Sequence, residues 1–292
     1  MPTLETKRIL APVLLTVLLF CSCAAFAQAQ EKELDTPYVP TPQVVVDRML
    51  DMAQVKAGDM VIDLGSGDGR IMITAAQRHG AQGFGVDIDP RLVQRSNEEA
   101  RRLGIADRVK FLRQDLFSTD FHEANVLTLY LLPDVNIALR PKILAELKPG
   151  TRVVSHDYDM REWRPDAEQT IPAPDKKVGM RKESMVYLWI VPARVEGEWT
   201  FELSSGGKTR RTRLVLQQHF QFVSGSVELT GQGDVPVSHG RLRGEELRLM
   251  LPPGALDRGP VELVGRVTGD SLSGTVRRAD REVANWSARR RN

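Results

Sequence analysis

The feature that most constrains this chain is a glycine-rich turn directly after a short apolar segment. Residues Met60–Leu64 are mostly apolar, and Gly65, Gly67 and Gly69 follow at alternate positions. Glycine lacks a Cβ, so this backbone can turn sharply and lie close to a ligand. Residues 71–79 are then expected to form a helix whose first N–H groups point at that ligand. The segment predicts a buried strand, a ligand-binding turn and a helix.

Two further segments bear on whether this is a ligand-binding turn or an ordinary tight turn. The spacing G-x-G-x-G departs from the G-x-G-x-x-G of dinucleotide-binding folds, which disfavours a nicotinamide or flavin dinucleotide. Gly83–Asp87 and Val109–Asp115 are two more apolar segments that end in an acid. Parallel strands would bring Asp63, Asp87 and Asp115 to one edge of a sheet, which favours ligand binding.

Strands and helices continue to alternate through residue 191. The first helix is expected to begin with Thr41 as its N-cap and Pro42 at its first helical position. The remaining expected elements are helices at 90–103 and 136–147, the latter broken near Pro141, and strands at 124–132, 151–156 and 185–191. Such alternation predicts a parallel sheet that is covered by helices on both faces.

Three segments, 63–70, 85–90 and 114–116, resemble the cofactor-binding motifs of class I S-adenosylmethionine-dependent methyltransferases. With Pro37–Pro42, the first segment is also similar to the protein-lysine N-methyltransferases related to those of the mitochondrial inner membrane, which in turn resemble the Dot1-type histone lysine methyltransferases. The resemblance covers roughly residues 36–192. It implies an α/β fold with a Rossmann-like, seven-stranded sheet whose last strand is antiparallel.

The resemblance also implies S-adenosylmethionine as the cofactor. Asp63 and the glycine turn would hold its amino-acid moiety, Asp87 would accept both ribose hydroxyls, Ile88 would stack on adenine, and Asp115 with the next backbone N–H would bind the adenine edge. Asp63 and Asp115 have the alternative of capping a turn or helix, and Tyr38 that of merely packing. The expected cofactor-binding residues are Tyr38, Asp63, Gly65, Ser66, Gly67, Gly69, Asp87, Ile88, Asp115 and Leu116.

The acceptor side is expected after the fourth and fifth strands. The candidate catalytic residues are Tyr130, Asp134 and His156, with Asn136, Asp157 and Asp159 close in sequence. Methyltransferases that modify amino groups of nucleic acids often carry Asp/Asn-Pro-Pro-Tyr/Phe after strand four, whereas this chain has Leu129–Asp134 there, which argues against an adenine acceptor. A packed or capping His156 is the alternative to a base. Asp157 and Asp159 lack the further ligands of a metal site, so no metal is expected.

The N-terminal sequence has the pattern of a targeting segment. Lys7 and Arg8 precede the apolar segment Ile9–Phe20, and Ala25–Ala27 is an A-x-A cleavage site. This predicts a signal peptide at 1–27, a leader at 28–40, and export to the periplasm or the medium. An uncleaved segment that anchors the protein to the membrane is the alternative. Both cysteines lie in the signal peptide, so a cleaved protein would have no disulfide.

The C-terminal residues 193–292 change to short alternating segments separated by glycine and proline. The expected strands are at 199–203, 212–216, 220–223, 225–229, 247–251, 261–267, 272–276 and 283–288. They predict a small antiparallel barrel or sandwich after the methyltransferase domain at 41–192. Gly197–Trp199 with Arg289 and Arg290 resembles lipocalin-like barrels, in which an arginine stacks on the tryptophan. Because the domain is short, we expect a filled, structural barrel.

The net charge bears on which partners the protein can have. A net charge of +2 gives no reason to expect a nucleic-acid partner. The favoured function is an exported methyltransferase that modifies a lysine amine of a protein substrate. Two alternatives stay open: a catalytically inactive protein that binds the cofactor and uses the barrel for recognition, and a methyltransferase for small molecules. Membrane association would come through the N-terminal segment, and the oligomeric state is open.

Overall fold

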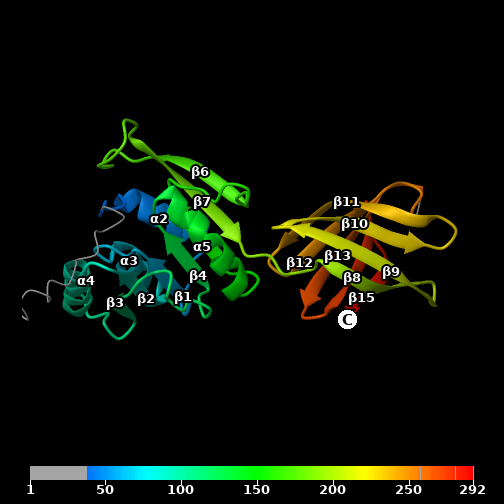
Figure 1. Cartoon of the computed structure of the whole chain (residues 1–292), viewed down its shortest axis with the longest axis horizontal. Coiled ribbons are helices and arrows are strands. Elements are labelled where there is room, and N and C mark those ends of the chain that lie inside the picture. Colours follow the sequence, from blue (N-terminus) through cyan, green and yellow to red (C-terminus); the bar gives the residue numbers. More distant parts are fainter. Residues whose placement is uncertain (1–37, 257, 280, 292) are drawn as a thin grey trace, which may run out of the picture. The chain divides into compact units, whose positions relative to one another are not determined.

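The computed structural model describes residues 38–256, 258–279 and 281–291. Along the chain they form a seven-stranded sheet with its helices and then a closed eight-stranded barrel (Figure 1), which confirms the predicted fold class. The predicted signal peptide, most of the leader and both cysteines lie outside the described residues. No helix in the described part of the chain is both long and apolar enough to cross a membrane.

The sheet has the strand order β3-β2-β1-β4-β5-β7-β6. Its strands are β1 Met60–Leu64, β2 Gln82–Asp87, β3 Val109–Arg113, β4 Val126–Leu129, β5 Arg152–His156, β6 Ala167–Pro172 and β7 Glu183–Ile190. Strands β1 to β5 are parallel, whereas β7 pairs antiparallel with both β5 and β6. The strand order reverses between β1 and β4, and such a switch point is where open α/β sheets bind ligands.

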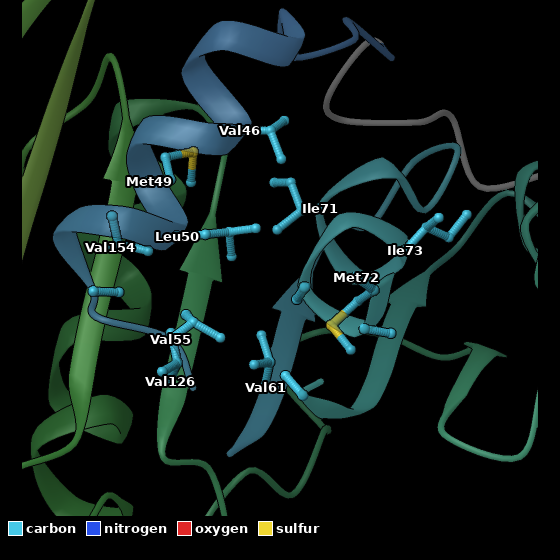
Figure 2. Close-up of a cluster of buried hydrophobic side chains, with 14 of the residues drawn as sticks. Val46, Met49, Leu50, Val55, Val61, Ile71, Met72, Ile73, Val126 and Val154 are labelled. Carbon is cyan, nitrogen blue, oxygen red and sulfur yellow. The ribbon is translucent and has the colours of Figure 1, made fainter. Parts of the chain in front are cut away.

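Both faces of the sheet are buried because neighbouring strand residues point to opposite sides. On one face, Val61 and Val126 pack with the helices α2 Gln43–Met52 and α3 Arg70–His79, which contribute buried residues such as Leu50 and Met72 (Figure 2). On the other face, Ile62 and Leu127 pack with Leu139 of α5 Pro133–Glu146. The helix α4 Pro90–Arg102 lies against β3 and β2. The parallel strands are therefore held rigidly with their carboxyl ends together.

Several local predictions for this region are wrong. Thr41 does not cap α2, because Pro42 occupies the N-cap position and the Thr41 hydroxyl faces the His156 ring instead. β4 ends at Leu129 and α5 starts at Pro133, so the predicted strand was too long and the helix began too late. The helix also continues through Pro141, since burial of Leu139 and Ile143 offsets one missing hydrogen bond. Strand β6 was missed because Ile171 is its only buried residue.

The C-terminal part is a closed antiparallel barrel in which consecutive strands pair and β15 returns to β8. Its strands are β8 Gly197–Ser205, β9 Lys208–His219, β10 Phe222–Leu229, β11 Gly233–Arg243, β12 Glu246–Leu251, β13 Val261–Thr268, β14 Ser271–Arg278 and β15 Arg281–Arg290. Apolar side chains, including Trp199 and Phe201, form one buried cluster inside it. The Arg290 guanidinium lies 4.3 Å from the centre of the Trp199 ring, which confirms the stacking pair.

The eight strands differ from the eight predicted segments at two places. The segments 220–223 and 225–229 belong to the single strand β10, whose register shifts between Val223 and Gly225. A Cβ at Gly225 would lie 1.9 Å from the Val215 carbonyl oxygen, so the strand needs glycine at this irregularity. Strand β11 was missed, because its buried residues Val235 and Val237 alternate with residues that usually mark turns.

Candidate functional site

The glycine turn follows β1 and has the backbone that a ligand-binding turn requires. Gly65, Gly67 and Gly69 have φ angles of 78°, 55° and 79°, a region that other residues rarely adopt. A Cβ at Gly67 would lie 2.7 Å from the Tyr38 ring, so Tyr38 lies directly against the turn. Tyr38 is also partly exposed.

Asp63 ends β1 beneath this turn and is almost completely buried. Its Oδ1 accepts a 2.6 Å hydrogen bond from the Thr128 hydroxyl, while its Oδ2 has no partner. The buried Ser66 hydroxyl also has none. Burial raises the pKa of Asp63 to about 7, and repulsion from Asp87 adds to the rise. An unpaired buried carboxylate oxygen is costly, and a cationic amino group such as that of S-adenosylmethionine fits this position.

The next two acids hold loops at the ends of β2 and β3. The carboxylate of Asp87 accepts 2.9 Å hydrogen bonds from the backbone N–H groups of Gly67 and Asp89, so it joins the glycine turn to the start of α4. Its oxygens retain lone pairs for a further donor. Asp115 accepts a hydrogen bond from the Phe117 N–H in the loop after β3. Ile88 is partly exposed beside Asp87, and the predicted roles of these residues toward a cofactor stay predictions.

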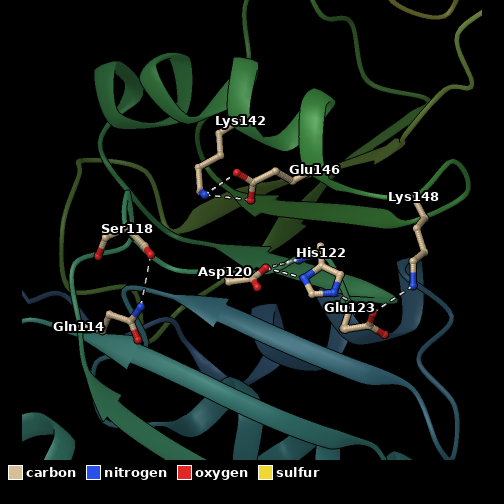
Figure 3. A network of polar contacts seen from close by, with 8 residues as sticks. All are labelled: Gln114, Ser118, Asp120, His122, Glu123, Lys142, Glu146 and Lys148. Atoms are coloured by element: carbon tan, nitrogen blue, oxygen red, sulfur yellow. Dashed lines mark hydrogen bonds and ion pairs between the residues drawn. The ribbon is translucent and has the colours of Figure 1, made fainter.

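The loop after β3 continues into an exposed polar network (Figure 3). His122 Nδ1 lies 2.6 Å from Asp120, and Glu123 pairs with Lys148. The hydrogen bond with Asp120 raises the pKa of His122. Exposed pairs of this kind contribute little free energy, and none of these side chains is buried. This network is best explained as a solvated surface and not as part of a catalytic centre.

Where the sequence predicts the acceptor side, aromatic rings lie after β4 and at the end of β5. The centroids of Tyr130 and His156 are 3.9 Å apart, and the Tyr158 ring stacks 6.3 Å from that of Tyr130. Burial raises the pKa of Tyr130 to about 12, so its hydroxyl stays protonated at neutral pH. This part of the molecule is therefore rich in aromatic rings.

His156 is fully buried and hydrogen-bonded at both nitrogens. Its Nδ1 lies 3.2 Å from the Thr41 hydroxyl and its Nε2 lies 2.9 Å from the Ser184 hydroxyl. Burial lowers the pKa of His156 to about 4, so the ring is neutral at physiological pH. These contacts favour the packed histidine over the predicted base. Asp134 is exposed in the first turn of α5, and the structure gives it no contact with Tyr130 or His156.

Several residues at the site were not predicted as such. Arg70 donates a 2.7 Å hydrogen bond to the Thr41 carbonyl and forms a two-pronged ion pair with Asp68. Burial and the charge of Asp68 raise the pKa of Tyr38. These contacts attach the segment before α2 to the glycine turn. A sequence signal existed, because Asp68 and Arg70 flank the last glycine of the turn.

The loop after β5 is fixed by contacts between side chains and backbone. Asp157 pairs with Lys176 at 2.7 Å and accepts a hydrogen bond from the Met185 N–H. The Asn136 amide donates to Ser155 and to the Tyr158 carbonyl. Among the described residues, no group of three or more His, Cys, Asp or Glu side chains is placed to hold a metal ion.

Comparison with known proteins identifies the family. The family model of the ANTKMT methyltransferase domain matches residues 63–167. A protein-lysine N-methyltransferase of Saccharolobus islandicus is 41% identical over 53% of this chain and 93% of its own length. A lysine N-methyltransferase of Xenopus laevis, named for a component of ATP synthase, is 32% identical over 70% of this chain and 79% of its own.

A solved structure is also similar, that of an RNA methyltransferase from Salinibacter ruber in complex with S-adenosylhomocysteine. It is 50% identical and covers 54% of this chain and 96% of that chain, with a TM-score of 0.49. This chain covers most of the length of both protein relatives, at 41% and 32% identity. The chain therefore belongs to the protein-lysine N-methyltransferase family and is an S-adenosylmethionine-dependent methyltransferase.

Proposed function

We propose that this enzyme methylates the ε-amine of a lysine in a protein substrate and that it does so outside the cytoplasm. The observation that carries the acceptor class is the pair of aromatic rings of Tyr130 and Tyr158, which lie beside the buried His156 ring. Aromatic faces attract an ammonium group, and a neutral His156 adds no repulsive charge. The family relationship to enzymes that are named for protein lysines supports the same acceptor.

The chain's own residues divide the task between two sides. The bound cofactor supplies an activated methyl group on a sulfonium. Asp63 and Asp87, under the glycine turn, are suited to bind the amino group and the ribose. On the other side, the half-buried surroundings of Tyr130 favour the neutral amine that must attack the methyl carbon. Because the pKa of Tyr130 is about 12, its hydroxyl stays protonated and does not remove the proton of the amine.

The proposed location rests on residues 1–27. A basic start, an apolar segment and an A-x-A site support export, with cleavage after Ala27. The catalytic domain is then assigned to 41–192 and the barrel to 193–292. Intact mass of the protein recovered from a bacterial periplasm tests this: a mass that lacks residues 1–27 supports the proposal, whereas a full-length, membrane-bound product would overturn cleavage.

The acceptor is tested by transfer of a labelled methyl group. The full chain is incubated with S-adenosylmethionine and, separately, with a protein extract, a small-molecule extract and total RNA. We expect label in proteins, at lysines identified by mass spectrometry. Label only in small molecules, or cofactor binding without transfer to any acceptor, would favour one of the two alternatives. Asp87→Ala is the control, because it removes the acceptor that holds the Gly67 N–H.

A further inference from the structure

The turn between β6 and β7 is attached to the acceptor side of the site. Lys176 forms a 2.7 Å ion pair with Asp157, and both side chains are largely buried. Asp157 directly follows His156, and Ser184 at the start of β7 contacts the His156 ring. The Ala173 N–H donates to the Lys182 carbonyl, which closes the turn at its base. These contacts fix where the turn begins and ends.

Residues 177–182, which we term the β6–β7 tip, present an exposed surface of mixed character. Val178 is 41% exposed and Met180 is completely exposed. Lys177, Arg181 and Lys182 are exposed beside them. Arg181 has a 3.4 Å contact with Glu183, whereas Lys177 and Lys182 form no ion pair with any described residue, although Lys182 Nζ donates a 2.8 Å hydrogen bond to the Lys176 carbonyl. Exposed methionine and arginine are characteristic of protein interfaces, and the uncompensated cations favour an acidic partner.

We propose that the β6–β7 tip docks the protein substrate and selects lysines that have an apolar residue and carboxylates nearby. The inference rests on the proposed lysine acceptor and adds which substrate residues are expected near that lysine. Met180 comes four residues after Lys176, so its backbone lies within about 14 Å of the Asp157 ion pair. An extended substrate covers that distance in about four residues. The selected residues should therefore lie within about five positions of the methylated lysine.

The probe is a set of three synthetic peptides with one central lysine. The first peptide carries leucine and glutamates at positions four and five residues away from the lysine. The second peptide is the same but has alanine in place of leucine. The third peptide is the same as the first but has arginine in place of the glutamates. Binding to the full chain with S-adenosylhomocysteine is followed by fluorescence anisotropy, and transfer by mass spectrometry. We expect the first peptide to bind about tenfold more tightly than the third, because two exposed charge pairs are exchanged for repulsion.

The variant is Lys177→Glu, and the matched control is Lys208→Glu, which makes the same charge change on an exposed barrel residue. Lys182 is left unchanged because its Nζ donates a hydrogen bond to the Lys176 carbonyl. The tip variant should lose the preference for the acidic peptide through KM, while kcat and cofactor affinity stay unchanged. The control should keep it. Met180→Ala should abolish the difference between the first and second peptides.

Three results would overturn the inference. They are equal binding of the first and third peptides, an unchanged preference in the tip variant, or a tip variant that loses binding only to vesicles of phosphatidylglycerol, which would make the tip a membrane contact. Failure of the proposed function is distinguishable, because the tip would then still discriminate the peptides in the anisotropy assay while no lysine acquired a methyl group.

Discussion

Burial of side chains has different consequences in the seven-stranded sheet and in the eight-stranded barrel. At the carboxyl ends of the sheet strands, burial gives Asp63 a pKa of about 7 and His156 a pKa of about 4. In the barrel, the raised pKa of Arg248 comes first from its hydrogen bond with the exposed Glu246. The barrel interior is an apolar cluster around residues such as Phe201. Burial at the strand ends perturbs chemistry, whereas burial in the barrel supplies stability.

The pH dependence of stability should separate the two regions most strongly. Between pH 3.8 and about 7, folded Asp63 keeps a proton that the unfolded chain releases. The contribution of Asp63 to the free energy of unfolding therefore falls as the pH rises through this range. This fall is on the order of 4 kcal/mol between pH 3.8 and about 7, and Asp63→Asn should remove it. Denaturant unfolding of the wild type and of the variant at several pH values measures it.

His156 should contribute with the opposite sign. Its pKa falls from 6.5 to about 4 on folding, so in this range the unfolded chain binds a proton that the folded chain does not. The contribution of His156 to the free energy of unfolding should rise by a few kcal/mol between about pH 4 and about pH 6.5, and His156→Gln should abolish this rise. The two groups oppose each other in the wild type, and the single variants should diverge from it in opposite directions. Curves that stay parallel would mean that neither residue titrates as described.

A matched pair of glycines sharpens the comparison through activity. Gly67 in the sheet region and Gly231 in the barrel both have positive φ angles, of 55° and 82°. Alanine should cost each position about 1–2 kcal/mol of stability. Only at Gly67 does the new Cβ also meet the Tyr38 ring. We expect Gly67→Ala to lower methyl transfer about 100-fold, equivalent to about 2.7 kcal/mol. Gly231→Ala should leave it unchanged, and equal losses in both would remove the turn's special role.

Sequence reasoning succeeded where the signal is local. The glycine turn after β1 follows from a few adjacent residues with one physical purpose, whereas the pairing of Trp199 with Arg290 came from the resemblance to lipocalin-like barrels. The same reasoning missed β6, because an exposed edge strand has no apolar alternation. It also missed β11, whose apolar residues are interrupted by Pro236 and Gly240.

Long-range contacts explain the errors at the candidate site. Thr41 has the local pattern of a helix cap, yet its hydroxyl contacts His156, 115 residues later in the chain. The ion pair of Asp157 with Lys176 and the contact of Ser184 with His156 likewise join strands whose pairing no local pattern encodes. Such partners become visible only when the antiparallel pairing of β5 and β7 is known.

The barrel should respond to a different kind of change. Arg290 stacks on Trp199, pairs with Asp270, and donates to the carbonyl oxygens of Arg194 and Glu196. Arg290→Ala should lower the free energy of unfolding by about 1–3 kcal/mol, since several hydrogen bonds and a cation–π contact are lost. Cofactor affinity, measured by calorimetry, should not change. A parallel loss of affinity would mean that the barrel supports the cofactor site after all.

The smallest effect is expected at Tyr130, where only the hydroxyl is removed. Its pKa of about 12 leaves it protonated across the working range, and the contact with His156 is made by the ring. Tyr130→Phe keeps that ring, so transfer should fall less than about threefold, or about 0.6 kcal/mol. The rise of the rate with pH should also be unchanged, because it follows deprotonation of the lysine. A 100-fold loss, or a displaced pH profile, would instead make the hydroxyl part of proton transfer.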